Sequence, residues 1–122
     1  MGKFHIHESE TGKFTFRLAA VNGETIAISQ AYTSKESCKK GIESVKKNAP
    51  IAAVEDQTVE GSSEKHPKYE VYSDHAGEFR FRLTAANGEN IIGSQGYVSK
   101  ESCKKGVASV QANAAAAEIA EG

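Results

Sequence analysis

The sequence predicts a single α+β domain with two pseudo-equivalent halves, in which two helices lie on one face of a single antiparallel sheet. Two observations predict this fold. Residues 12–49 return as residues 77–114 with unbroken spacing, so that Cys38 matches Cys103 at an offset of 65 positions. Within each copy, stretches that alternate apolar and polar residues precede one stretch with helical periodicity.

The duplication also predicts that the two copies close on each other. An open stack of repeats needs about three units to bury a continuous core, and this chain has two copies in 122 residues. Each copy alone would have a marginal core. We therefore expect the copies to pack together as a fused homodimer would, with pseudo-two-fold symmetry.

The first copy opens with two predicted strands. Phe4 and Ile6 alternate with His5 and His7. After a turn at residues 11–12, an alternating stretch continues to residue 19. Its inward residues are Phe14, Phe16 and Leu18, and its outward residues are Thr15, Arg17 and Ala19.

A hairpin follows at Asn22-Gly23, and residue parity indicates its loop length. A two-residue turn would scatter the apolar residues over both faces. A three-residue loop of residues 21–23, with Gly23 left-handed, pairs Leu18 with Ile26 and Phe16 with Ile28. We predict the second arrangement, because it keeps one face of the sheet dry.

A helix is predicted over residues 35–48, with Ser34 as its N-cap. Its apolar stripe consists of Cys38, Ile42 and Val45, which would cover the dry face of the sheet. Gly41 lies on or beside this stripe and indicates a close approach of helix to sheet. Pro50 ends the helix.

Residues 1–58 form the first predicted repeat, residues 59–67 a polar linker and residues 68–122 the second repeat, all in one globular domain. Residues 51–54 are apolar enough for a fourth strand. The second copy repeats the scheme, but Ala115 replaces Pro50. Residues 114–118 therefore suit either a longer helix or a strand.

The block SKESCKKGIESVKKNA, behind an NGE hairpin and an FRFRL strand, resembles the YegP-like family of small bacterial and archaeal proteins without an assigned biochemical role. The resemblance covers both copies, as in the tandem form of that family. It implies a β3-α-β unit used twice in one antiparallel sheet, with the last strand of each unit exchanged onto the other. The exchanged strands would be residues 51–54 and 117–120. The family supplies no catalytic residues.

Composition excludes several classes of function. The net charge of −1 gives no overall attraction to nucleic acid or anionic lipid. The longest apolar stretches are far shorter than a membrane-spanning helix, and the start has no signal-peptide core. Two matched cysteines are neither a disulfide framework nor a zinc set. We expect a cytoplasmic protein, a monomer with internal pseudo-dimer symmetry, that has no contact with membranes.

The sheet face opposite the helices is the predicted binding surface, for a protein segment or an anionic ligand. Its arginines would bind anions, although ordinary cross-strand ion pairs with acids explain them as well. The candidate binding residues are Thr15, Arg17, Ser29, Arg80, Arg82 and Ser94, with Ala27, Thr84 and Ile92 on the same face. A second basic surface, on the helices, comprises Lys39, Lys40, Lys46, Lys47, Lys104 and Lys105.

No catalytic signature accompanies these residues. Cys38 and Cys103 share the apolar stripes of their helices, which favours buried structural thiols over reactive ones. His5 and His7 have metal-chelating spacing but lack an obvious third ligand. Residues 73–75 read as a turn. We predict a non-enzymatic binding or protein-interaction module without metal or cofactor. Nucleic-acid association through the basic patches is the alternative, and a thiol-dependent enzyme is the third hypothesis.

Overall fold

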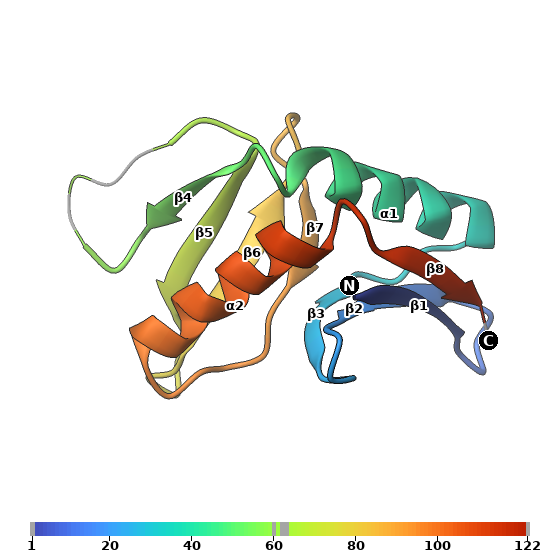
Figure 1. Cartoon of the computed structure of the whole chain (residues 1–122), viewed down its shortest axis with the longest axis horizontal. Coiled ribbons are helices and arrows are strands. Elements are labelled where there is room, and N and C mark those ends of the chain that lie inside the picture. Colours follow the sequence, from blue (N-terminus) through green and yellow to red (C-terminus); the bar gives the residue numbers. More distant parts are fainter. Residues whose placement is uncertain (1, 60, 62–63, 122) are drawn as a thin grey trace.

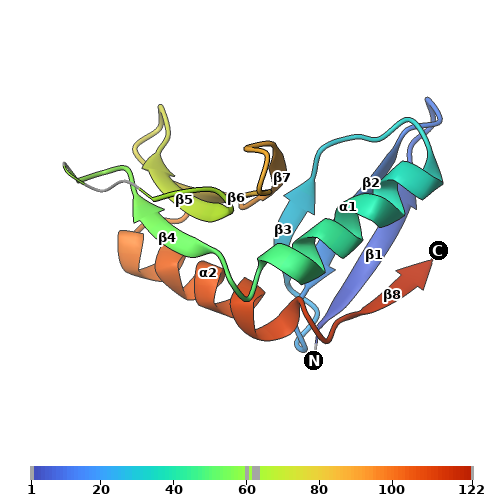
Figure 2. The ribbon, with the colours of Figure 1, turned by 90° about the horizontal axis from the view of Figure 1, so that it is seen from above.

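The computed structural model describes residues 2–59, 61 and 64–121, without the side chains of residues 120 and 121. The first repeat contains β1 (Lys3–Glu8), β2 (Phe14–Ala19), β3 (Thr25–Ser29), α1 (Lys35–Asn48) and β4 (Ala53–Asp56). The second contains β5 (Lys68–Ser73), β6 (Phe79–Thr84), β7 (Asn90–Gly93), α2 (Lys100–Asn113) and β8 (Glu118–Glu121). Both helices cover the same face of the sheet (Figures 1 and 2).

The eight strands form one sheet in the order β4-β5-β6-β7-β3-β2-β1-β8. β4 pairs with β5 of the second repeat, and β8 pairs with β1 of the first. The exchange of the last strands is therefore confirmed. We call β3, β2, β1 and β8 the β1 side of the sheet, and β7, β6, β5 and β4 the β5 side.

The sheet is mixed, which corrects the expectation of a purely antiparallel one. The inner pairs are antiparallel, but β4–β5 and β1–β8 are parallel. Hairpin turns set the direction of β2, β3, β6 and β7, and those turns are visible in the sequence. The edge strands enter after a helix, so no turn residue dictates their direction.

The exchanged strands also begin later than predicted. β4 covers residues 53–56 and β8 covers residues 118–121. After α1, the backbone amides of Ile51 and Ala52 both donate to the Asn48 carbonyl, so these residues form a turn. Ile51 is exposed there. In the second repeat a similar turn follows Ala114, and the open question of the tail is answered in favour of a strand.

α1 begins and ends at the predicted residues, and α2 covers the matching residues of the second repeat. The Ser34 hydroxyl accepts the Ser37 amide at 3.1 Å, as Ser99 accepts that of Ser102. Gly41 brings α1 against an aromatic ring, because a Cβ at this position would collide with the Tyr32 hydroxyl. Tyr32 in turn stacks on Phe16. The glycine thus allows the close approach that its place in the stripe predicts.

One core is shared by the two repeats. α1 packs on β2 of its own repeat and on β7 of the other, while α2 packs on β6 and β5 and also on β3. Tyr69 in β5 is fully buried, and its hydroxyl donates to the Ala49 carbonyl at the end of α1, at 2.8 Å. Removing either repeat would expose the apolar face of the other.

The hairpin loop is the predicted one, but the strand register beyond it differs. The Ala20 amide donates to the Glu24 carbonyl around a three-residue loop, and Gly23 has a φ of 88°. Ala19 then faces Thr25, whereas Leu18 faces Ala27. The extra residue is a β-bulge at Ile26, so the predicted pairs Leu18–Ile26 and Phe16–Ile28 are wrong.

Candidate functional site

A single row of side-chain positions crosses the outer face of the sheet. Residues paired across neighbouring strands run in the order Glu55, Glu70, Arg82, Gly93, Ile28, Arg17, His5 and Ala120. Arg17 and Arg82 therefore do occupy symmetric places in one sheet. Three strand spacings separate them, or about 15 Å.

On the β5 side, the row is a network of ion pairs. Lys68 lies 2.9 Å from the Glu55 carboxylate and 3.2 Å from that of Glu70, and all three residues are buried. Glu70 also accepts a bond from Arg82. The Arg82 guanidinium lies over the Tyr72 ring, 4.4 Å from its centroid.

These contacts lower the pKa of both carboxyl groups. Hydrogen bonds from Gln57, Lys68 and the Glu64 amide lower the pKa of Glu55 to about 2. Burial opposes the ionisation of Glu70, but its bonds to Arg82 and Lys68 still hold its pKa below the ordinary value. On the β5 side, the charge of Arg82 is therefore already neutralised by Glu70.

Arg80 is balanced in the same way. Its Nε donates to Asp74 at 2.7 Å, and this bond holds the pKa of Asp74 below its usual range. Asp74 also accepts the amides of Ala76 and Glu78, which supports the interpretation of residues 73–75 as a turn. Arg80 was predicted as a binding residue, but its guanidinium is engaged within the protein.

The hydroxyls of the two candidate serines are hydrogen-bonded to the backbone of the sheet and the segments that follow it. Ser29 is buried, and its hydroxyl accepts the Phe16 amide and donates to the Gln30 carbonyl. Ser94 makes the matching bonds to Phe81 and Gln95. Each hydroxyl replaces a backbone hydrogen bond that the nearby bulge removes from the strand pairing. The prediction that Ser29 lines an open face is wrong, because Ser29 is buried. Ser94 is half-buried and its hydroxyl is already hydrogen-bonded.

The bulges also exchange residues between the two faces. Ala27, Ile92 and Thr84, predicted to face outward, are buried. Ile28, predicted to face inward, is 54% exposed, and Gly93 is its counterpart. A bulge turns two successive side chains, Ile26 and Ala27, toward the core and shifts the alternation by one.

On the β1 side, the same row carries positive and titratable groups without matching acids. Arg17 is exposed and lies between His5 and Ile28. Among the described side chains, none forms an ion pair or hydrogen bond with its guanidinium. A shallow pocket of about 170 Å³ is lined by these three residues together with Thr15, His7 and Phe16.

Both cysteines lie in the core. Cys38 and Cys103 are free and have no exposed surface. Burial raises the pKa of both thiols, that of Cys103 to about 11. A thiol in this state is a poor nucleophile at neutral pH.

The described residues include no cluster of three His, Cys, Asp or Glu side chains that would hold a metal ion, with His5 and His7 or elsewhere. Within the same part of the chain, no helix is long and apolar enough to cross a membrane.

The lysines of the helices divide into two groups. Lys100 and Lys104 reach Asp56 of the exchanged strand β4, at 3.1 and 3.6 Å. These contacts hold a strand of one repeat to the helix of the other. Lys39, predicted on the basic surface, likewise has an interaction within the protein. Lys40, Lys47 and Lys105 are exposed, as expected for a solvated helix surface.

Sequence reasoning missed Lys68, Glu55 and Tyr72, which make up most of the network on the β5 side. The alternation of Lys68, Glu70 and Tyr72 along one strand was visible in the sequence. Glu55 could not be found in this way, because it reaches the network only through the strand exchange.

These observations define a class of protein, a two-layer α+β domain made of two strand-exchanged β3-α-β repeats. The family described as a domain of unknown function, DUF1508, matches residues 9–56 and again residues 74–121, once per repeat. The chain belongs to this family.

The chain is similar both to relatives of about its own length and to relatives of about half its length. A UPF0339 protein of the ptx operon 5' region of Stutzerimonas stutzeri is 38% identical over 98% of this chain and 96% of its own length. A UPF0339 protein of Treponema denticola is 60% identical over 53 residues, 43% of this chain and 91% of its own. It therefore corresponds to about one repeat.

The fold is also known from a solution structure. That of YegP, a protein of unknown function from Escherichia coli, has a TM-score of 0.81 and 38% identity, covering 98% of this chain and 91% of the other. This similarity confirms the predicted family and the α+β fold.

Proposed function

We propose that the protein is a non-enzymatic binding module that holds an acidic segment of a partner protein on the outer face of β1, β2 and β3. The observation that carries this proposal is the contrast between matched arginines. Arg82 bonds to Glu70, whereas His5 takes the place of Glu70 beside Arg17. An unneutralised, exposed guanidinium binds carboxylates in bidentate geometry.

The neighbours of Arg17 suit a peptide better than a free anion. Ile28 offers an apolar side chain beside the guanidinium, and Thr15, His5 and His7 add polar contacts. An extended segment with alternating acidic and apolar residues would place its carboxylate on Arg17 and an apolar side chain on Ile28.

A synthetic peptide of alternating glutamate and leucine tests this function. Binding, measured by NMR titration, should move the backbone resonances of residues 5–7, 15–17 and 28. The substitution Arg17→Glu should reduce affinity at least tenfold, because it replaces attraction by repulsion. Arg82→Gln, at the matched position, should leave affinity unchanged.

Equal losses from both variants, or no resonance shift on the β1 side, would contradict the proposal. Affinity capture from the native cell extract identifies the natural partner as a protein that the parent chain and Arg82→Gln retain and Arg17→Glu loses. Binding of DNA or RNA at this face, with affinity falling steeply as salt rises, would favour the nucleic-acid alternative instead.

We also infer that the chain acts in the cytoplasm as a monomer, with residues 1–58 and 68–122 as repeats and 59–67 as their linker. Two buried, unpaired thiols support a reducing compartment. The shared core supports one folding unit.

A further inference from the structure

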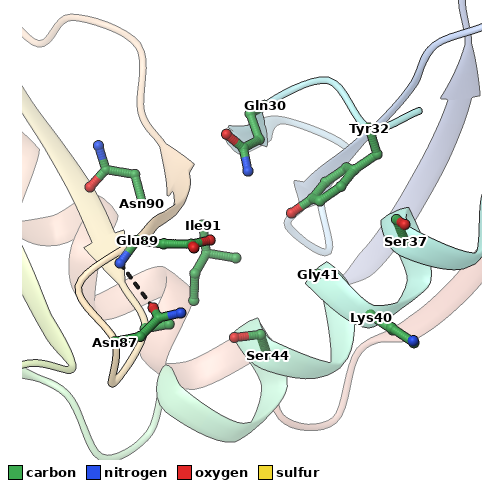
Figure 3. Close-up of a pocket in the computed structure, with 11 residues that line it drawn as sticks. Gln30, Tyr32, Ser37, Lys40, Gly41, Ser44, Asn87, Glu89, Asn90 and Ile91 are labelled. Atoms are coloured by element: carbon green, nitrogen blue, oxygen red, sulfur yellow. Dashed lines mark hydrogen bonds between the residues drawn. The ribbon is translucent and has the colours of Figure 1, made fainter. Parts of the chain in front are cut away.

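A polar groove lies on the helix side of the molecule, where the two repeats meet. One wall is the end of β3 and α1 of the first repeat, and the other is the hairpin between β6 and β7 of the second (Figure 3). The groove has a volume of about 250 Å³. A ligand in it would contact both repeats at once.

The two repeats provide an internal comparison of how freely different surfaces have changed. Ten of the eleven residues that line the groove recur at the matching position of the other repeat, the exception being Asn90, whose counterpart is Thr25. On the outer sheet face, only Arg17 recurs among His5, His7, Thr15, Arg17 and Ile28. Both surfaces have had the same time to diverge since the duplication, so the age of the copies does not explain the difference.

Packing accounts for part of this identity. Gly41 makes room for Tyr32, and the Ser44 hydroxyl accepts a bond from Asn48. Asn87 accepts the amide of Glu89 within the hairpin. These residues are required by the fold, whatever the groove does.

Packing does not account for Lys40 and Glu89, and the Gln30 side chain has a hydrogen bond to Tyr32, inside the groove. Gln30, Lys40 and Glu89 are all exposed, and their counterparts are Gln95, Lys105 and Glu24. On α1, which carries Lys40, the exposed Glu43 has changed to Ala108, although the exposed Lys35 and Glu36 recur as Lys100 and Glu101. A polar surface residue that no contact of the fold requires stays the same most simply because it binds something.

The chemistry of the groove indicates the kind of ligand. The Gln30 amide, the Tyr32 hydroxyl and the Glu89 carboxylate point into the same space. Lys40 lies at the edge of the lining, with its amino group pointing away from these three groups (Figure 3). Hydroxyl and amide groups can each donate and accept. One lysine and one glutamate leave the groove without net charge, so neither an anion nor a cation is favoured.

We propose that this groove and its symmetric counterpart are two equivalent sites for an uncharged polyhydroxy compound of the size of a monosaccharide. Each hydroxyl of such a ligand both donates and accepts, which matches the mixed lining. The site is distinct from the sheet face proposed for the acidic segment and does not depend on it.

By the symmetry of the repeats, the matching residues of the second repeat should line a counterpart groove. Burial raises the pKa of Tyr97, and the nearby charge of Glu24 in the first repeat adds to this shift, as the charge of Glu89 does for Tyr32. Each site therefore takes its carboxylate from one repeat and its phenol from the other. The proposal predicts two binding sites per chain.

NMR titration of the full chain with D-glucose, D-ribose and myo-inositol tests the proposal. At least one of them should produce saturable shifts at residues 30–44 and 85–91 and at the matching residues 95–109 and 20–26. Acetate and ethylamine, as charged probes, should not. Glu89→Ala should abolish the shifts of the first groove alone, and Glu24→Ala those of the second alone.

Glu43→Ala is the matched control on the same helix, and it should leave both sets of shifts intact. Three outcomes would overturn the proposal: no saturable shift with any of the three polyols, shifts with the charged probes only, or shifts that persist in the first groove of Glu89→Ala. Tyr32→Phe keeps the ring against Phe16 and removes only the hydroxyl. It should weaken binding in the first groove severalfold without unfolding the chain.

Discussion

Where the β5 side of the sheet carries Glu70, the β1 side carries His5. This one difference separates two arginines that occupy the same place in their repeats. Arg82 belongs to a network with Glu70, Lys68 and Glu55, while Arg17 lies exposed beside Ile28. The comparison teaches that a duplicated strand pattern fixes where a side chain points but not whether its charge is available for binding.

The largest expected effect tests whether the two sides share one core. Phe16→Ala and Phe81→Ala remove matched, fully buried rings, and each should cost about 3 to 5 kcal/mol of unfolding free energy. Denaturant unfolding should show a single transition in both variants. A separate transition for one repeat would contradict the shared core.

The next effect separates the two sides at one matched position. Glu70→Ala leaves Arg82 without its acid and Lys68 with only Glu55, which should cost about 1 to 3 kcal/mol. His5→Ala, on the β1 side, should change stability by no more than about 0.5 kcal/mol. Thermal unfolding of the two variants under identical conditions measures the difference, and equal losses would remove the contrast between the sides.

Acid should act through the β5 side. The folded-state pKa of Glu55 is about 2, below its ordinary 4.5, so the unfolded chain takes up this proton first. The stabilisation from Glu55 is therefore complete above about pH 4.5 and is lost as the pH falls toward 2. Asp56, whose pKa is lowered to about 2 by its bonds to Thr58 and Lys100, adds to the loss.

Glu55→Gln should flatten this part of the profile of stability against pH, measured by denaturant unfolding at successive pH values. The Asp56 contribution should remain. An unchanged profile would show that the Glu55–Lys68 pair does not hold the exchanged strand.

The smallest effect concerns the Tyr69 hydroxyl, which joins the two repeats in the core. Tyr69→Phe removes the bond to the Ala49 carbonyl and should cost about 1 kcal/mol. Phe4 is its counterpart and has no hydroxyl. A Tyr69→Phe variant as stable as the parent protein would mean that the bond to Ala49 adds nothing to stability beyond the packing of the Tyr69 ring.

Much of the fold could be predicted because local signals determine it. The Ser34 cap, the stripe of Cys38, Ile42 and Val45, and the left-handed Gly23 each act within a few residues. The bulge at Ile26 could not be predicted, since both neighbours are apolar and either register buries one of them. This extra residue shifts the alternation by one, so that Ile28 faces outward and Ser29 inward, opposite to the prediction.

The candidate site was predictable only in part, for a related reason. The outward direction of Arg17 and Arg82 follows from strand alternation. Whether each arginine is paired depends on the residue that faces it on the neighbouring strand, Glu70 for Arg82 and His5 for Arg17. The rest of the network depends on Glu55, which reaches Lys68 only through the exchange of β4.

The exchange of β4 and β8 has a further consequence for how such a molecule can change over time. In a self-associating single-repeat protein, every substitution appears on both subunits, so both faces must stay identical. Here the two copies are encoded separately and yet each supplies a strand to the other's edge. The second copy can keep the ion pairs that attach the exchanged strand β4, while the first copy loses the matching acid and leaves Arg17 exposed.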